Sequence, residues 1–149
     1  MEIKQSTLKN GLRIITAEWP QIETVSLGVW VNTGAAAESE ADNGISHFMV
    51  FKGTKKRNSL QISEDIENVG GATNAYTSRH FTCFYAKMLK DDLELATDVI
   101  CDFITDPTFD AAEMSKEKEV VVQEIKQSAD APDDLVFDYF QEAAFPNQA

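Results

Sequence analysis

Residues 44–54 of the sequence read GISHFMVFKGT, and they decide how the rest of the chain is interpreted. A polar stretch over residues 38–43 leads into this segment, where helical spacing begins. His47 is one of two histidines in the 149-residue chain. The residues three and four positions after it are Val50 and Phe51, so the next turn offers only apolar side chains. We expect a short helix that carries one potential metal ligand and lacks a second one on the same face.

Composition and charge narrow the class of protein. A chain of 149 residues with 43% hydrophobic residues fits one soluble globular domain. No stretch approaches the ~20 consecutive apolar residues of a membrane span, and the N-terminus lacks the apolar run of a signal peptide, so we expect neither membrane insertion nor secretion. The formal net charge of -12 repels nucleic acids and anionic membranes and favours positively charged partners such as basic peptides.

The two cysteines, Cys83 and Cys101, are too far apart in the sequence for a paired metal motif, and each has apolar neighbours. We expect both to be buried, reduced thiols, because a free cysteine usually behaves as a small core residue and a disulfide framework would need more of them. This expectation favours a reducing compartment.

Strand patterns occupy two parts of the chain. Residues 12–17 and 24–31 are rich in β-branched and apolar residues on either side of a turn near Pro20, which predicts that they pair as antiparallel strands. Residues 74–79 and 82–89 carry aromatic, threonine and cysteine residues, and the short interval between them predicts a hairpin.

Helical periodicity predicts four further helices. Their expected extents are residues 60–69 with Ser59 as the N-cap, from Asp91 to a stop at Pro107, from Asp110 to Gln127, and from Pro132 onward. Their apolar stripes contain Ile62, Ile66, Val69, Leu95, Val99 and Phe103. Strands that are followed by a hairpin among helices indicate an α+β fold, with a mixed, largely antiparallel sheet and helices packed on one face.

Several segments resemble, in the same order and near the same spacing, the N-terminal half-domain of the insulinase, pitrilysin and mitochondrial-processing-peptidase family of zinc metallopeptidases. The matching segments are Leu8-Lys9-Asn10-Gly11-Leu12 (opening strand), Gly44-Ile45-Ser46-His47-Phe48 (zinc helix), Phe51-Lys52-Gly53-Thr54 (following loop), Gly70-Gly71 with Asn74-Ala75-Tyr76-Thr77 (substrate-side strand) and Glu117 to Glu124 (helix with the last metal ligand). The resemblance implies that residues 1–149 form a single metallopeptidase-like domain that ends within the first of two related halves.

The zinc helix of this family carries the motif H-x-x-E-H. Two histidines four positions apart project from one helical face and bind one zinc ion, and the glutamate beside them activates water. By resemblance, His47 is the first metal ligand and Glu124 is the last. Glu117 lies on the same face as Glu124, two turns earlier, where it could orient a ligand or the water. The valines between the two glutamates, residues 120–122, predict burial nearby.

The second histidine and the glutamate of that motif are absent from this sequence. Either they were substituted in place, or three residues were lost between Phe48 and Met49. We prefer loss, because inserting Leu-Glu-His at that point restores the family pattern on both sides, whereas substitution leaves the downstream segment three positions early. Three residues make slightly less than one turn, ~4.5 Å of helix. The loss removes the general base and one of the usual three zinc ligands.

The resemblance implies a zinc metalloendopeptidase domain that acts on short or unstructured peptides through metal-activated water. The gap predicts that this form is inactive and that it binds zinc weakly or not at all. Residues Asn74, Ala75, Tyr76 and Thr77 are expected either to form an edge that an extended peptide joins as another strand, or simply to be a core strand. His80 is expected to be an exposed turn residue and not a substitute ligand.

The alternative is a noncatalytic peptide-binding or scaffolding subunit that pairs with a second half-domain or an active partner subunit. Either function fits the bacterial cytoplasm or the mitochondrial matrix, and neither involves nucleic acid or a membrane.

Overall fold

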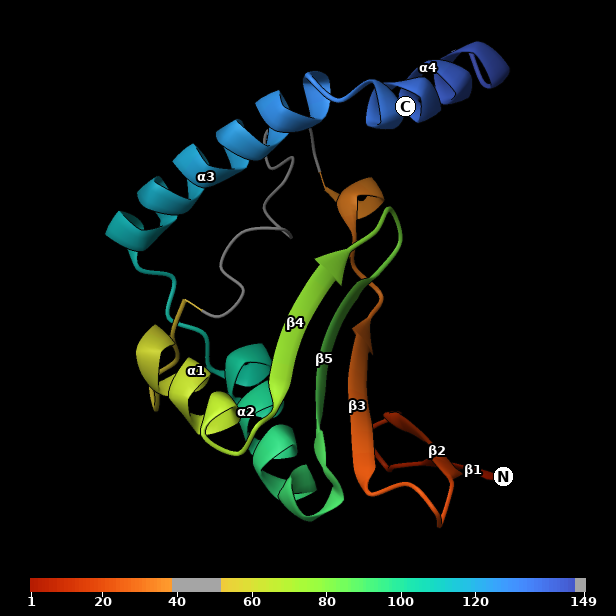
Figure 1. Cartoon of the computed structure of the whole chain (residues 1–149), viewed down its shortest axis with the longest axis vertical. Helices are drawn as coiled ribbons and strands as arrows, with labels where there is room; N and C mark the ends of the chain where they lie inside the picture. Colours follow the sequence, from red (N-terminus) through yellow and green to blue (C-terminus); the bar gives the residue numbers. More distant parts are fainter. Residues whose placement is uncertain (39–51, 147–149) are drawn as a thin grey trace.

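A computed structural model describes residues 1–38 and 52–146 of the chain (Figure 1). The described strands are β1 (Glu2–Thr7), β2 (Arg13–Glu18), β3 (Thr24–Val31), β4 (Ala72–Thr77) and β5 (Thr82–Leu89). The described helices are α1 (Ser59–Glu67), α2 (Leu93–Thr105), α3 (Ala111–Ala129) and α4 (Pro132–Ala144), with short 3-10 turns η1 (Ala35–Ala37) and η2 (Lys90–Asp92). The predicted α+β class is confirmed.

Strands β3, β5 and β4 form an antiparallel sheet in which β5 is central. The predicted hairpin of β4 and β5 is confirmed, and the hydroxyl groups of Thr77 and Thr82 lie 3.1 Å apart at its closed end. β3 pairs with β5 along its whole length, from Thr24 opposite Leu89 to Val31 opposite Thr82. Within the described residues, β4 is therefore an edge strand.

The pairing predicted for the first two strand segments is wrong. β2 pairs with β1 in a separate two-stranded sheet, and β3 pairs with β5. The segment Leu8–Leu12, which resembles an opening strand, instead forms the turn of the β1–β2 hairpin. In this turn the Leu8 N–H donates to the Leu12 carbonyl oxygen at 2.8 Å, and Gly11 has a φ of +89°, which a residue with a side chain rarely adopts.

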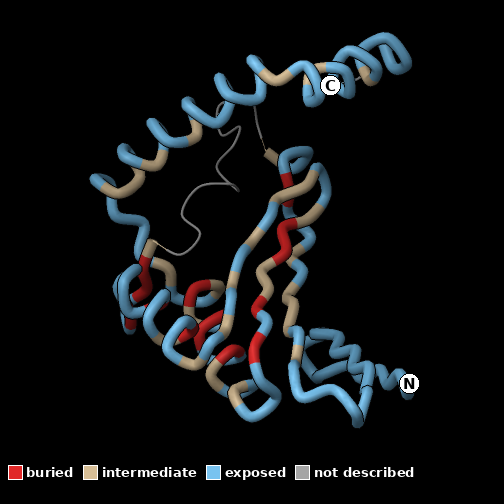
Figure 2. The backbone as a smooth tube through the Cα atoms, in the orientation of Figure 1, coloured by how far each residue is buried: buried red, intermediate tan, exposed pale blue. Residues whose placement is uncertain are grey.

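The hydrophobic core lies between one face of the β3–β5–β4 sheet and the helices α1 and α2 (Figures 1 and 2). Its buried members are Ile62, Ile66, Ala86, Met88, Ala96, Val99, Ile100 and Phe103. On β5, Phe84 packs against Phe103 with the ring centroids 5.6 Å apart. The helical spacing that predicted the stripes of α1 and α2 is confirmed, since Ile62, Ile66, Val99 and Phe103 are all buried.

Helices α3 and α4 lie apart from this core and follow each other end to end, with contacts between them near their junction (Figure 1). Neither contains a buried residue. Val120 and Val122 on α3 are 47% and 40% exposed, so the burial predicted from the valine run is not found within the described structure. None of the described helices combines the length and the apolar character that crossing a membrane requires.

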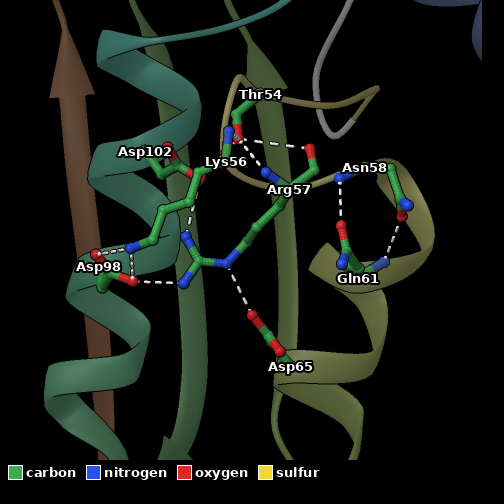
Figure 3. Close-up of polar contacts among 8 residues, drawn as sticks. All are labelled: Thr54, Lys56, Arg57, Asn58, Gln61, Asp65, Asp98 and Asp102. Carbon is green, nitrogen blue, oxygen red and sulfur yellow. Dashed lines mark hydrogen bonds and ion pairs between the residues drawn. The ribbon is translucent and has the colours of Figure 1, made fainter.

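The helix starts differ in detail from the sequence prediction. The N-cap of α1 is Asn58 and not Ser59, because Asn58 and Gln61 exchange side-chain to backbone hydrogen bonds, both of 2.9 Å (Figure 3). Such a reciprocal pair is a capping box. Asp110 begins α3 as predicted, with its carboxylate accepting hydrogen bonds from the backbone N–H groups of Ala112 and Glu113 at 3.0 Å.

Both cysteines are free thiols, as predicted, but only Cys83 is buried. Burial raises the pKa of the Cys83 thiol more than a hydrogen bond with Tyr76 lowers it, so the neutral thiol is favoured. The expectation that Cys101 is also buried is wrong. Cys101 follows the fully buried Ile100 on α2 and faces away from the core.

Candidate metal and peptide site

The residues predicted to form the site come from three parts of the chain. His47 lies outside the described residues, together with both flanks of the predicted gap. Glu117 and Glu124 both lie on α3, and their spacing of seven residues places them two turns apart on one helical face. The four residues Asn74, Ala75, Tyr76 and Thr77 lie on the edge strand β4.

Glu117 is engaged by a lysine of the same chain. The Lys52 Nζ atom lies 2.5 Å from Glu117 Oε2, and the two side chains are only 30% and 19% exposed. The two groups are therefore in direct contact as an ion pair that is mostly shielded from solvent. Glu124 is exposed and also takes part in a polar or electrostatic interaction.

The described residues do not fit a zinc ion. No three His, Cys, Asp or Glu side chains in residues 1–38 and 52–146 lie close enough together to hold a metal. A zinc site needs at least three protein ligands, with a fourth position for water in a catalytic centre. At Glu117, an ammonium group of the same chain already contacts one carboxylate oxygen, Oε2.

The segment that follows the predicted gap is fixed to the core by Arg57 (Figure 3). Its guanidinium donates to Asp65 on α1 at 2.7 Å, to Asp102 on α2 at 2.8 Å, and to Asp98 on α2. The Arg57 side chain is only 10% exposed. Burial lowers the pKa of Arg57, but the hydrogen bonds with the three aspartates outweigh burial and raise the pKa above its usual value. The cation is therefore permanent.

Thr54 and Gly53 extend this attachment to the connection between α2 and α3. The Thr54 hydroxyl donates to Asp102 at 2.7 Å and accepts from the Arg57 backbone N–H at 2.8 Å. The Thr108 N–H donates to the Gly53 carbonyl oxygen at 3.0 Å. Lys52 is thus the residue directly before a segment that is fixed to α1, to α2 and to the start of α3.

Sequence reasoning missed this network, although it left a signal. Asp98 and Asp102 are four residues apart, so they share one face of α2, where carboxylates next to a buried apolar stripe require a cation. The basic run over residues 55–57 is the counterpart, with Lys56 Nζ also lying 2.7 Å from Asp98 Oδ2.

The outer edge of β4 presents backbone groups that β5 does not use. The Ala75 N–H donates to the side-chain oxygen of Asn74 at 2.8 Å, so it points away from β5. Because backbone groups alternate in direction along an antiparallel strand, the N–H and C=O groups of Thr73 point to the same outer edge. Tyr76 is 47% exposed and packs edge-on against Phe81 in the hairpin turn, with ring centroids 6.0 Å apart.

His80 lies in the same turn, between β4 and β5, and is exposed as predicted. Its backbone N–H donates to the Ser78 hydroxyl at 3.4 Å. Nothing in the described structure brings this imidazole to Glu117 or Glu124 as a metal ligand.

The family model for Insulinase (Peptidase family M16) matches residues 13–149. This chain belongs to the insulinase family. The insulinase-family chain is 43% identical to the "Uncharacterized zinc protease YmxG" of Bacillus subtilis, over 99% of this chain and 37% of that protein. It is 39% identical to the "Mitochondrial-processing peptidase subunit beta" of Rattus norvegicus, over 99% of this chain and 31% of that protein. It therefore spans about a third of the length of these relatives.

A solved structure, "The crystal structure of a protease from Helicobacter pylori", shares the fold of this insulinase-family domain. The TM-score is 0.84 at 22% sequence identity, and the match covers 91% of this chain and 34% of that one. At this identity the likeness concerns the fold alone.

The alignments contain positions that this insulinase-family chain lacks. The match with the rat protein extends over 151 residues, but 99% of a 149-residue chain is at most 148 residues. At least three aligned positions of the relative therefore have no counterpart here. This lower bound equals the number of residues in the gap that the sequence predicts after Phe48.

Proposed function

We propose that this chain is a peptidase-family domain that holds extended peptides without hydrolysing them. The observation that carries this proposal is the sequence after His47, where Val50 and Phe51 stand in place of the glutamate and histidine of H-x-x-E-H. Neither side chain can bind zinc or accept a proton from water, so the domain lacks both the second histidine ligand and the general base.

Two further observations support the loss of zinc chemistry. The match with the rat relative contains at least three aligned positions that this chain lacks, as a deletion within the motif would produce. In the described part of the chain, the Glu117 carboxylate is paired with Lys52. His47 and Glu124 then remain as two protein ligands, which is one fewer than a catalytic zinc site uses.

Peptide binding is supported by the edge of β4. An extended peptide can join such an edge as a further strand through backbone hydrogen bonds, with few demands on its sequence. The Ala75 N–H donates to the side-chain oxygen of Asn74. A carbonyl oxygen of a bound peptide would take the place of that side-chain oxygen and accept the same hydrogen bond. A net charge of -12 favours a basic peptide.

Zinc content and cleavage test the inactive state. We expect the purified chain to hold less than stoichiometric zinc by metal analysis and to leave a basic, unstructured fluorogenic peptide intact. Stoichiometric zinc together with chelator-sensitive cleavage would overturn the proposal. The companion variant has Leu-Glu-His inserted between Phe48 and Met49, and it should gain zinc. If that variant folds but gains none, the deletion hypothesis fails.

Peptide binding is tested at Ala75. Ala75→Pro removes an N–H on the free edge of β4 and leaves the hydrogen bonds with β5 in place, because proline is tolerated at an edge whose N–H faces outward. We expect this variant to weaken the binding of a basic peptide in fluorescence anisotropy, with an unchanged circular dichroism spectrum. The control is Lys87→Met, at an exposed position on β5. Its affinity for the basic peptide should change only by the small amount expected from losing one charge.

A scaffolding role is favoured by one specific observation. Helix α4 exposes large apolar side chains whose exposed fractions all exceed half of the residue surface: Val136, Phe137, Tyr139, Phe140 and Phe145. Such a surface is typical of an interface. A second half-domain or a partner subunit would cover it, since the curated relatives are about three times as long as this chain. Size-exclusion chromatography with the remaining part of such a relative tests this role. The bacterial cytoplasm or the mitochondrial matrix suits either function.

A further inference from the structure

The Lys52–Glu117 ion pair joins α3 to the body of the domain. α3 contains no buried residue, and the helix that follows it, α4, also lies apart from the core. Figure 1 shows both helices extending away from the sheet and from α1 and α2. Lys52 belongs to the segment attached to that body, whereas Glu117 lies in the second turn of α3. The 2.5 Å contact between Lys52 Nζ and Glu117 Oε2 therefore links α3 to the body of the domain.

The backbone next to Lys52 is held firmly. Gly53 accepts a hydrogen bond from Thr108, Thr54 is bonded to Asp102, and Arg57 is bonded to three aspartates. A lysine on a mobile loop loses much side-chain freedom when it forms an ion pair, and an exposed pair therefore contributes little. Here the backbone is already ordered and both side chains are mostly shielded, so less is lost when the pair forms.

A divalent cation bound to the Glu117 carboxylate would lie close to the Lys52 ammonium group, and repulsion between the two positive charges would weaken its binding. Glu117 is the acidic residue for which the family resemblance implied a role near the metal. The described structure gives that carboxylate a cation from its own chain, and no set of metal ligands forms around it.

We propose that Lys52 is the internal cation of this site: it neutralises Glu117 in place of a divalent metal and positions α3 against the segment that follows the predicted gap. The inference rests on the proposed function in one respect, the absence of a bound metal.

Hydrogen exchange in the full chain tests the positioning role. We expect Lys52→Met and Glu117→Gln each to speed the amide exchange of residues 111–129 by about five- to tenfold, which corresponds to losing an interaction in the upper part of the range of an ordinary hydrogen bond. The double variant should exchange no faster than either single variant, because both remove the same contact. Lys52→Arg keeps the cation and should retain the exchange rate of the wild type. The matched control is Lys116→Met, which removes an exposed ion pair with Glu113 on the same helix and should change nothing.

Unchanged exchange in a folded Lys52→Met variant would overturn the positioning role, as would additive effects in the double variant. Where Lys52→Met does not fold, the reversed pair Lys52→Glu/Glu117→Lys decides the matter. It should restore the rate of the wild type, and a folded reversed pair with fast exchange in α3 also refutes the role.

Zinc titration against a chromophoric chelator tests the internal cation. Lys52→Met should bind zinc about tenfold more tightly than the wild type, and adding Glu117→Gln should abolish the gain. Equal affinities in the wild type and Lys52→Met would refute competition between lysine and metal. Cleavage of a peptide by the wild type contradicts the proposed function alone, because the exchange experiment decides the Lys52–Glu117 contact independently.

Discussion

Arg57 offers the sharpest test of how the segment after the predicted gap is held. Arg57→Met removes the guanidinium and keeps most of the aliphatic stem. It leaves Asp102, whose side chain is 9% exposed, with the Thr54 hydroxyl as its remaining partner in this network. Removing one partner of a buried ion pair costs ~3–5 kcal/mol. Asp65 and Asp98 are 40% and 49% exposed, so water replaces much of what they lose.

The expected loss is therefore near the lower end of that range, about 3 kcal/mol, which is a large part of the ~5–15 kcal/mol of a typical domain. Urea unfolding followed by circular dichroism measures it as a change in the free energy of unfolding. Arg57→Lys keeps the charge but not the planar fork that reaches three carboxylates, and we expect about half of the loss. Lys55→Met is the matched control. It removes a neighbouring ion pair whose lysine is 75% exposed, and no resolvable change is expected.

Two results would refute this reasoning. One is a loss below about 1 kcal/mol in Arg57→Met, because that is the range of an exposed ion pair. The other is additivity. Arg57→Met combined with Asp102→Asn should cost less than the sum of the two single variants, since the charges they remove depend on each other.

Three further predictions concern the core, the backbone and pH. Ile100→Ala should cost ~2–5 kcal/mol in urea unfolding, because this side chain is fully buried. Gly34→Ala should prevent stable folding or sharply lower the melting temperature, because its Cβ would lie 2.3 Å from a backbone carbonyl oxygen of the β4–β5 turn. Gly28→Ala should cost far less, because its Cβ would meet only the ring of Trp30, which is 61% exposed and can move. Hydrogen bonds from Lys56 and then Arg57 lower the pKa of Asp98, so its contribution to stability is complete above the unfolded pKa of about 3.9 and is lost as the pH falls through the lower folded value. The difference in unfolding free energy between wild type and Asp98→Asn should therefore be present at pH 7, begin to shrink below about pH 4 and disappear only below the lower folded pKa, and a difference that does not shrink at low pH would contradict this account.

Local patterns in the sequence predicted the elements whose partners are close in the chain. The spacing of Ile62 and Ile66 placed α1 on the core, and the short interval before Thr82 placed β4 beside β5. The pairing of β3 with β5 was not predicted, because Thr24 and Leu89 meet across more than sixty residues and no local signal connects them. The apolar residues of α3 indicated that this helix packs on another surface. They could not indicate that no described part of the chain covers them.

The candidate site was predicted unevenly. The missing glutamate and histidine after His47 are features of the sequence itself, so the structure was not needed to find them. The roles of Glu117, Glu124 and the β4 edge remain predictions. The Lys52–Glu117 contact was not foreseen, because it joins a loop to a helix 65 positions away and depends on how Arg57 fixes that loop.

The residues around the gap are bounded by two separate attachments. Upstream, Ala35 and Ala36 donate backbone hydrogen bonds to the β4–β5 turn at 3.1 and 2.8 Å. Downstream, Arg57 secures the chain to α1 and α2. The described members of the hydrophobic core come from residues 25–29 and 62–104, on either side of these attachments. A gene that lost three codons there in a single event would thus encode a protein without its chemistry but with its scaffold intact, and natural selection could retain that scaffold for binding.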